Sequence, residues 1–289
     1  MGQVIHGGAP ASDQLSQNIW QGFPFHATQN RVHPVGTPSA RFVMEDYLGF
    51  GMTAAVSSNL GRYAGRAGVY QSWEDTGGSI AGLATLTGGG VRLTNDTTDN
   101  DEVNMQLGTV TGVLGALSLT AGNAGCQPTF WESRNRWPTQ VASGDTFCGM
   151  AEEGVAVTDF FTDADAFADK DWIGFYTLVG APTTLKFGYH KAGGTAVSFT
   201  VATIVVDTFY KLGWKFIPPG FPGYDPAKVI RTYVDNVEIT SDYVTYAQAS
   251  SSTHFPGDEE MSPMKSVKNS TTVARALDET FYAWGQLIG

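Results

Sequence analysis

Short runs of alternating apolar and polar residues fill most of the chain, and Gly, Asn, Asp and Pro separate the runs. Alternation of this kind places apolar side chains on one face of a strand and polar side chains on the other. Runs rich in β-branched and aromatic residues between turn residues are typical of successive strands. In the first half, strands are predicted at Phe42–Tyr47, Gly68–Trp73, Val91–Thr94, Val103–Leu107 and Phe130–Arg134.

The second half predicts two hairpins with a strand between them. Residues 185–189 alternate strictly, and Lys191-Ala-Gly-Gly supplies a turn into a strand over residues 197–201. Residues 210–216 place Leu and aromatic side chains on one face and Lys and Gly on the other. Residues 230–239 form the second hairpin, because its Asp-Asn turn tolerates the positive φ of a two-residue connection.

A helix and a closing strand complete the expected elements. Residues 162–170 predict a short helix, with a Thr cap and early acids. A loop with a Lys268-Asn-Ser turn leads to an aromatic final strand that includes Leu277 and Trp284. We expect that strand to close a jelly-roll sandwich against the first strand, which makes the fold all-β and antiparallel.

The chain is predicted to be one domain with appendages. Residues 1–40 form an extended N-terminal arm, 41–249 the β-sandwich, 250–272 an exposed loop excursion, and 273–289 the closing strand. No internal repeat supports blades or a solenoid.

The arm carries Trp20, Phe23 and Phe25 without strand or helix periodicity. Such a segment cannot bury a core of its own, so its aromatic side chains need another surface. That surface is either the arm's own domain or a neighbouring subunit, and in the second case these residues form an interface.

Composition and charge restrict the function. Of the 289 residues 35 are Gly and 16% are charged, and the net charge is -11. An acidic chain without clustered Lys and Arg argues against nucleic-acid binding. No apolar run is long enough to span a bilayer, and the first residues lack a basic-then-apolar signal pattern, so we expect no membrane partner and synthesis in a cytoplasm. Cys126 and Cys148 are expected to be buried thiols or to form a single bridge.

An acidic loop is the candidate metal site. Asp96, Asp99 and Asp101 concentrate oxygen ligands of the kind that calcium takes. Asp163, Asp165, Asp169 and Asp171 form a second acidic set. The alternative is an ordinary solvated turn whose acids accept hydrogen bonds from turn amides.

Exposed aromatic side chains are the candidate glycan contacts. Trp137 precedes Pro138 in a predicted loop and is the preferred stacking platform, with Trp73 and Trp172 as further candidates. The alternative for each is a core position, which the alternation around Trp214 predicts clearly for that residue.

Catalytic motifs are not found in the sequence. Glycosidases on sandwich folds need paired carboxylates, which a Glu-x-Asp-x-Glu strand supplies, and no such triplet occurs. Glu132 lies on a predicted strand, but Arg134 follows where the second acid belongs. Nucleophile elbows and phosphate loops are missing too. The chain is therefore predicted not to be an enzyme and to need no cofactor other than the calcium considered above.

Several ordered motifs resemble one family. They are Phe130-Trp-Glu-Ser-Arg, Phe147-Cys-Gly-Met-Ala-Glu, Asp171-Trp-Ile-Gly-Phe-Tyr, the stretch 180–197, Tyr210-Lys-Leu-Gly-Trp-Lys-Phe, Val234-Asp-Asn-Val-Glu and 263–270. Together they resemble tailed-bacteriophage virion structural proteins that carry a concanavalin-like or laminin-G-like jelly roll. The resemblance spans roughly residues 42–287.

The resemblance implies a structural role in the virion. The expected function is that of a capsid decoration or cement protein, made in the host cytoplasm and located on the capsid surface. Its partners would be the major capsid protein and further copies of itself, with a trimer expected. The alternative is a head fibre or tail adhesin that binds host surface glycans.

Overall fold

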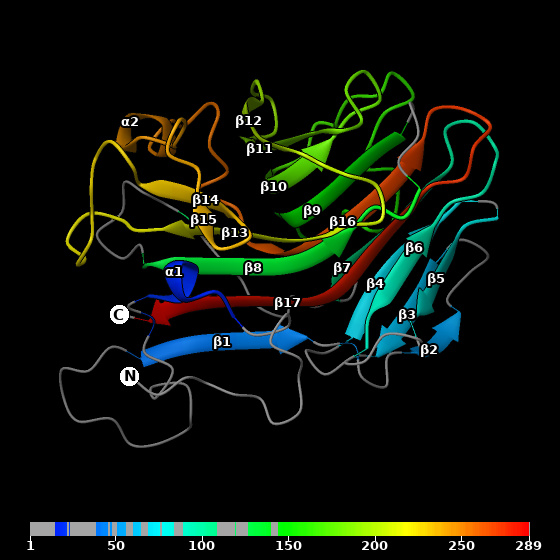
Figure 1. The fold of residues 1–289 in the computed structure, drawn as a ribbon, viewed down its shortest axis with the longest axis horizontal. Helices are drawn as coiled ribbons and strands as arrows, with labels where there is room; N and C mark the ends of the chain where they lie inside the picture. Colours follow the sequence, from blue (N-terminus) through cyan, green and yellow to red (C-terminus); the bar gives the residue numbers. More distant parts are fainter. Residues whose placement is uncertain are drawn as a thin grey trace.

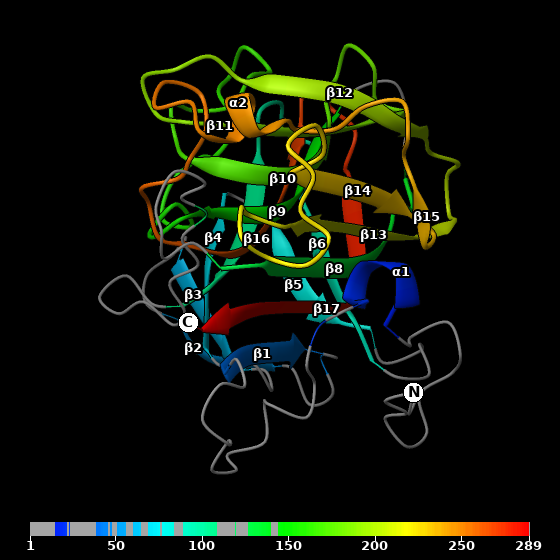
Figure 2. The same ribbon diagram turned by 90° about the vertical axis from the view of Figure 1, so that its left-hand side faces the viewer.

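Antiparallel pairing joins all of the strands into two sheets, which pack face to face (Figures 1 and 2). The computed structural model describes residues 15–21, 23, 39–45, 47, 51–55, 60–64, 69–75, 77–83, 89–108, 119, 127–139 and 144–288. Phe25 and Cys126 lie outside these residues. The antiparallel jelly-roll sandwich predicted from the alternation is confirmed.

The first sheet has the strand order β15-β14-β13-β8-β17-β6-β5, and β1 also pairs with β17. Its strands are β1 (Ser39–Glu45), β5 (Ser79–Gly82), β6 (Val91–Thr94), β8 (Thr129–Arg136), β13 (Phe209–Phe216), β14 (Ile230–Val234), β15 (Val237–Glu238) and β17 (Ala276–Ile288). The closing strand β17 pairs with β1 from Ser39↔Ile288 to Glu45↔Tyr282, as the sequence predicts.

The second sheet has the order β12-β11-β10-β9-β16-β7-β4-β3-β2. Its strands are β2 (Gly51–Ala55), β3 (Leu60–Ala64), β4 (Val69–Glu74), β7 (Glu102–Leu107), β9 (Gly144–Glu152), β10 (Trp172–Thr177), β11 (Thr184–His190), β12 (Val197–Thr203) and β16 (Met261–Asn269).

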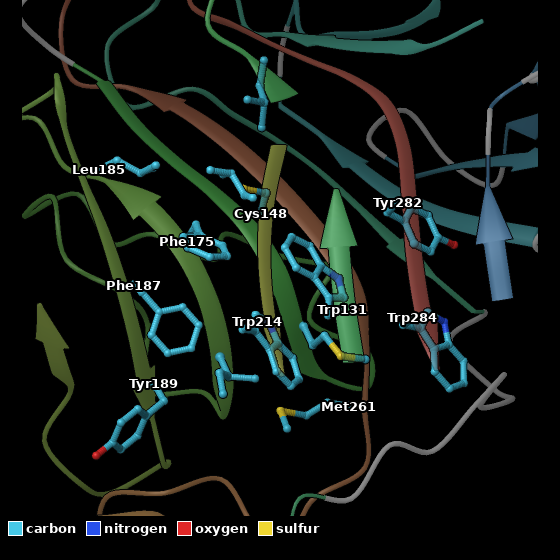
Figure 3. Packing of buried hydrophobic residues seen from close by; sticks show 14 of the residues in the cluster. Trp131, Cys148, Phe175, Leu185, Phe187, Tyr189, Trp214, Met261, Tyr282 and Trp284 are labelled. Carbon is cyan, nitrogen blue, oxygen red and sulfur yellow. The ribbon is translucent and has the colours of Figure 1, made fainter. Parts of the chain in front are cut away.

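The main core lies between the two sheets and is built from alternate residues of their strands. Trp131 of β8 stacks on Phe175 of β10 with ring centroids 5.9 Å apart and on Trp214 of β13 at 6.5 Å (Figure 3). Cys148 lies in this layer as a buried free thiol. The predicted core position of Trp214 is therefore confirmed.

Both predicted hairpins form. β11 and β12 pair antiparallel across the Lys191–Gly194 turn. β14 and β15 are joined by Asp235 and Asn236, with φ values of 49° and 65°. Asp and Asn reach this left-handed region more readily than most residues, which is why this short turn can form.

Two predicted elements are wrong. Residues 162–170 form turns instead of a helix, because Phe161 and Phe167 pair in a β-bridge and pack into an aromatic cluster. The predicted excursion 250–272 is not wholly exposed, since its residues 261–269 are the buried strand β16 in the middle of the second sheet. Within the residues that the structure describes, the helices are α1 (Gln17–Trp20) and α2 (Tyr246–Ala249).

The N-terminal segment, residues 15–23, packs on the outer face of the first sheet (Figure 1). Trp20 stacks on Phe130 with centroids 5.8 Å apart, and both Trp20 and Phe23 are buried. These two side chains thus contact their own domain, which is the first of the two surfaces considered for the arm. They are not available as an interface in this arrangement.

No helix in the described ranges has the length and apolar character needed to cross a bilayer.

Candidate functional site

The outer face of the second sheet near β4 and β7 presents a mixed aromatic and polar surface. Tyr70, Val103 and Met105 point into the core between the sheets. Strand alternation therefore places Trp73 and Asn104 on the opposite, outer face. These two residues are also direct partners in the β4–β7 register.

A loop over residues 153–171 covers part of this outer face. Buried Glu102 accepts hydrogen bonds from the backbone N–H groups of Phe160 and Phe161, at 3.0 Å and 2.9 Å, and from Ser266 Oγ at 2.6 Å. Asn104 Nδ2 donates to the carbonyl oxygen of Thr158 at 2.9 Å. The loop is thereby fixed to the sheet on both sides of Asp159.

Burial raises the pKa of Glu102 to about 7, and these donated hydrogen bonds act in the opposite direction. A carboxylate that accepts several donors is better suited to anchoring the loop than to meeting a ligand, because none of its surface reaches solvent.

Trp73 and Asp159 meet at the edge of this loop. Trp73 Nε1 donates to Asp159 Oδ1 at 3.3 Å. Asp159 is exposed, whereas Trp73 is half-buried. Partial burial raises the pKa of Asp159, and the negative charges of Asp75 and Asp163 raise it further. The site therefore combines an aromatic ring with a group of carboxylates.

The other tryptophans offer no comparable surface. Of the seven in the chain, six are at most 5% exposed, and Trp73 is the exception. Trp137, the stacking platform preferred from the sequence, is fully buried, and its Nε1 donates to Thr146 Oγ1 at 2.9 Å. Trp172 is buried as well. The stacking prediction at Trp137 is wrong, because its ring lies in the core and packs edge-on against Tyr210, with ring centroids 6.2 Å apart.

The acidic loop of the calcium prediction forms a different arrangement. The Asp96 and Asp101 carboxyl groups lie close enough to affect each other's pKa, while Asp99 is exposed. Burial, followed by the contact with Asp96, raises the pKa of Asp101 to about 7. Asp96 also accepts from the Thr98 backbone N–H at 2.6 Å, so it serves the turn itself.

In the part of the chain that the structure describes, no three His, Cys, Asp or Glu side chains are grouped as a metal site would require. The described contacts of Asp96 and Asp101 lie within their own loop. They match the ordinary turn that the sequence analysis gave as the alternative to a calcium site. They give the calcium prediction no coordination geometry to build on.

Glu132 lies on the outer face of the first sheet under the N-terminal segment. Its carboxylate accepts from Trp20 Nε1 at 2.6 Å, from Ser16 Oγ at 2.6 Å and from the Ser16 backbone N–H at 3.0 Å. Burial raises its pKa, and the donors from Ser16 and Trp20 lower it. Its partners make Glu132 the anchor of the N-terminal segment.

Comparison with solved structures places the fold among lectins and glucanases. Peanut lectin in complex with a nine-residue peptide matches with a TM-score of 0.50 and 11% identity, over 87% of this chain and 99% of that chain. The Bacillus licheniformis β-glucanase matches at 0.44 with 12% identity, over 89% and 100%. The endo-β-1,3-glucanase of Pyrococcus furiosus matches at 0.43 with 14% identity, over 87% and 92%. No protein-family model and no curated protein sequence matches the chain.

These matches define the class as a concanavalin-like jelly-roll sandwich, and at these identities they show the fold alone. They also correct the expectation that the chain is not an enzyme. The finding behind this correction is that glucanases are among the matching structures, and at 12% and 14% identity with TM-scores below 0.5 these matches show the fold alone.

The sequence named Trp73 among the glycan candidates but did not find Asp159. The signal for Trp73 is its polar setting, Gln-Ser-Trp-Glu, at the end of a strand. Asp159 is 86 residues away along the chain and meets Trp73 only through the loop that Glu102 holds. No local pattern could have paired the two.

Proposed function

We propose that this chain is a structural protein of a tailed-phage virion, of the type that binds the outside of the head and stabilises the shell. The observation that carries the proposal is the strand β12, an uncharged strand at the open edge of the second sheet. A protein that attaches to a shell needs a surface that another chain can extend, and β12 has the properties of one.

β12 pairs with β11 on one side, and no other described strand pairs with its outer edge. Figure 2 shows it as the uppermost strand of the sheet. Residues 195–206 contain no charged residue, no Pro and no Gly. Proteins usually protect such edges with charges, Pro or a cover, because unpaired N–H and C=O groups recruit another strand.

Partly buried side chains on this edge would gain from a partner strand. Val197 and Phe199 pack against the core but stay half-exposed, and Val205 and Val206 just beyond the strand are 61% and 41% exposed. An added strand would supply main-chain hydrogen bonds and bury these groups, which is the strand-addition mode of binding.

The partners consistent with this edge are the major capsid protein and a further copy of the chain. The chain carries a net charge of -11, so copies repel one another over most of their surface. An uncharged edge avoids that repulsion. The resemblance to phage virion proteins supports the same assignment, and its motifs occupy the paired strands β8, β9, β10, β11, β13 and β16.

The test uses purified virions and a variant of the edge. Quantitative mass spectrometry should give a copy number comparable to that of the major shell protein. The variant Ser198→Glu/Thr200→Glu places two charges on exposed positions of β12, and we expect it to lose binding to shells that lack the protein. Thr240→Glu/Ser241→Glu adds the same charge at exposed positions away from the edge and should bind normally.

Absence of the chain from virions would refute the virion role. A copy number far below that of the shell protein would move the proposal from the head surface to a fibre or tail. Full shell binding by the Ser198→Glu/Thr200→Glu variant would remove β12 as the attachment surface.

A further inference from the structure

We propose that the outer face of the second sheet at Trp73 binds a neutral sugar unit of a glycan, with the indole ring as the stacking surface and Asp159 as the hydroxyl acceptor. The site lies on β4 and on the loop 153–171, and it uses neither β12 nor the N-terminal segment. The inference therefore goes beyond the proposed attachment to a shell and is independent of it.

The first argument is the position of the ring. Trp73 lies near the end of β4 and faces outward, whereas Tyr70 on the same strand points into the core. It is the one tryptophan of the seven that is not buried. A large aromatic side chain with an apolar face and a polar tip is well suited to a ligand that has both CH and OH surfaces.

The second argument is the orientation of that ring. The hydrogen bond from Trp73 Nε1 to Asp159 Oδ1 holds the indole at its polar edge. Asp159 itself is fixed, because Phe160, the next residue, donates its N–H to Glu102 at 3.0 Å. A surface whose side chains are already held loses little conformational entropy when a ligand binds.

The third argument is the supply of acceptors. Asp159 has a second carboxylate oxygen for a sugar hydroxyl, and its charge makes that hydrogen bond stronger than one between neutral groups. Asn104 lies opposite Trp73 in the register, and its buried amide oxygen has no hydrogen-bond partner among the described residues. Because no surface of Asn104 reaches solvent, an ordered water is the partner that fits this oxygen, and Asp159 remains the acceptor that a sugar hydroxyl can reach.

Charge selects the kind of sugar. Asp75 and Asp163 lie near enough to raise the pKa of Asp159, so the ring is surrounded by negative charge. Lys268 is the cation among the groups that act on Asp159, and its Nζ donates to the carbonyl oxygen of Thr162. A sugar that bears carboxylate or sulfate groups would be repelled at this surface, whereas a neutral sugar would not.

The experiment is a glycan array of neutral and acidic glycans probed with the full chain, followed by calorimetric titration of the strongest neutral oligosaccharide. Trp73→Ala should weaken its binding by roughly tenfold or more, because one buried aromatic contact commonly dominates a small interface. Trp73→Phe should restore part of the affinity, and Asp159→Asn should weaken binding while leaving the ring in place.

Tyr243→Ala is the matched control, since it removes a half-buried aromatic side chain far from this face, and it should bind as the unmodified chain does. Circular dichroism and Tm identify any variant that fails to fold. Three outcomes would each overturn the proposal: no neutral glycan bound by the unmodified chain, preference for acidic glycans, or unchanged affinity in folded Trp73→Ala. None of them bears on shell attachment, and loss of shell attachment does not bear on this site.

Discussion

Trp20 Nε1 donates a hydrogen bond to Glu132 Oε2 at 2.6 Å, which joins residues 112 positions apart on the outer face of the first sheet. Ser16 donates to the same carboxylate, and Lys215 Nζ donates to the Asn18 carbonyl oxygen at 2.9 Å. The segment 15–23 is consequently part of the folded domain. Removing residues 1–39 would uncover Glu132 and Phe130, so an N-terminal truncation that leaves the domain intact has to end before Leu15.

Trp20→Ala is the direct test of this contact. It removes a buried ring and one donor to Glu132, and we expect a loss of about 3 kcal/mol in the free energy of unfolding. Thermal unfolding should show a Tm lower by roughly 6 to 12 °C. Gln21→Ala changes an exposed neighbour in the same segment and should leave the Tm nearly unchanged. Equal Tm values for the two variants would contradict the role of Trp20.

Gly213 makes room for the same segment. A Cβ atom at this position would lie 2.3 Å from Ile19 Cδ1, closer than any tolerated contact. Gly213→Ala is expected to displace the segment and lower stability. Adding Ile19→Ala should recover part of the loss, because the smaller side chain removes the clash. Gly180→Ala, where a Cβ meets no atom within 4 Å, is the control.

The measurement for Gly213 is urea unfolding of the two single variants and the double variant. Two results would contradict the close packing of α1 on β13. One is a Gly213→Ala variant as stable as the unmodified chain, and the other is a double variant whose loss in the free energy of unfolding equals the sum of the two single losses.

Stability should fall as pH rises from about 4 to 7, and Asp101 contributes to that fall. Its pKa is about 7 in the folded protein against 3.8 without perturbation. The folded state therefore holds the proton more tightly, and the stabilising contribution, present at pH below 3.8, is lost as pH rises to about 7. Glu102, with a pKa of about 7, and Asp145, with a pKa of about 6, act in the same direction.

Asp101→Asn keeps a donor toward Asp96 but cannot ionise, so it should be more stable than the unmodified chain at pH 7 and should show a smaller loss between pH 4 and 7. Urea unfolding at several pH values measures both effects. Asp99→Asn, an exposed position in the same loop, is the control. An unchanged pH dependence in Asp101→Asn would contradict the raised pKa of Asp101.

Lys265 and Glu279 form a buried ion pair between the sheets, with side chains 4% and 2% exposed, and Tyr47 contacts both. Lys265→Met leaves a buried carboxylate without its cation and should cost about 3 to 5 kcal/mol. Lys265→Met/Glu279→Leu removes both charges, and we expect it to be more stable than the single variant. Chemical unfolding measures the free energy of unfolding of both variants. A double variant less stable than Lys265→Met would contradict the expectation.

Local pattern was sufficient for most strands. The turn at Lys191–Gly194, the positive-φ pair Asp235-Asn236 and the final strand follow from alternation and turn chemistry, because these depend on residues a few positions apart. The sandwich class follows from the same signals.

Local pattern failed where distant segments competed for a residue. The Thr162 cap and the early acids favour a helix start, yet Phe167 gains more by packing on Trp172, with ring centroids 4.1 Å apart. Trp137 precedes a proline in a predicted loop, yet its ring is buried and packs against Tyr210 of β13. Burial of an aromatic side chain outweighs the small free-energy differences of local propensity.

The sequence by itself determined most of the strands, their apolar faces, both hairpin turns and the all-β class, because strand alternation and turn conformation are short-range properties. Tertiary structure alone decided that Trp20 anchors its own domain through Glu132 and that Trp73 stays accessible beside Asp159. Which of seven similar rings is buried depends on which distant segment covers it, and that choice is made by packing of the whole chain.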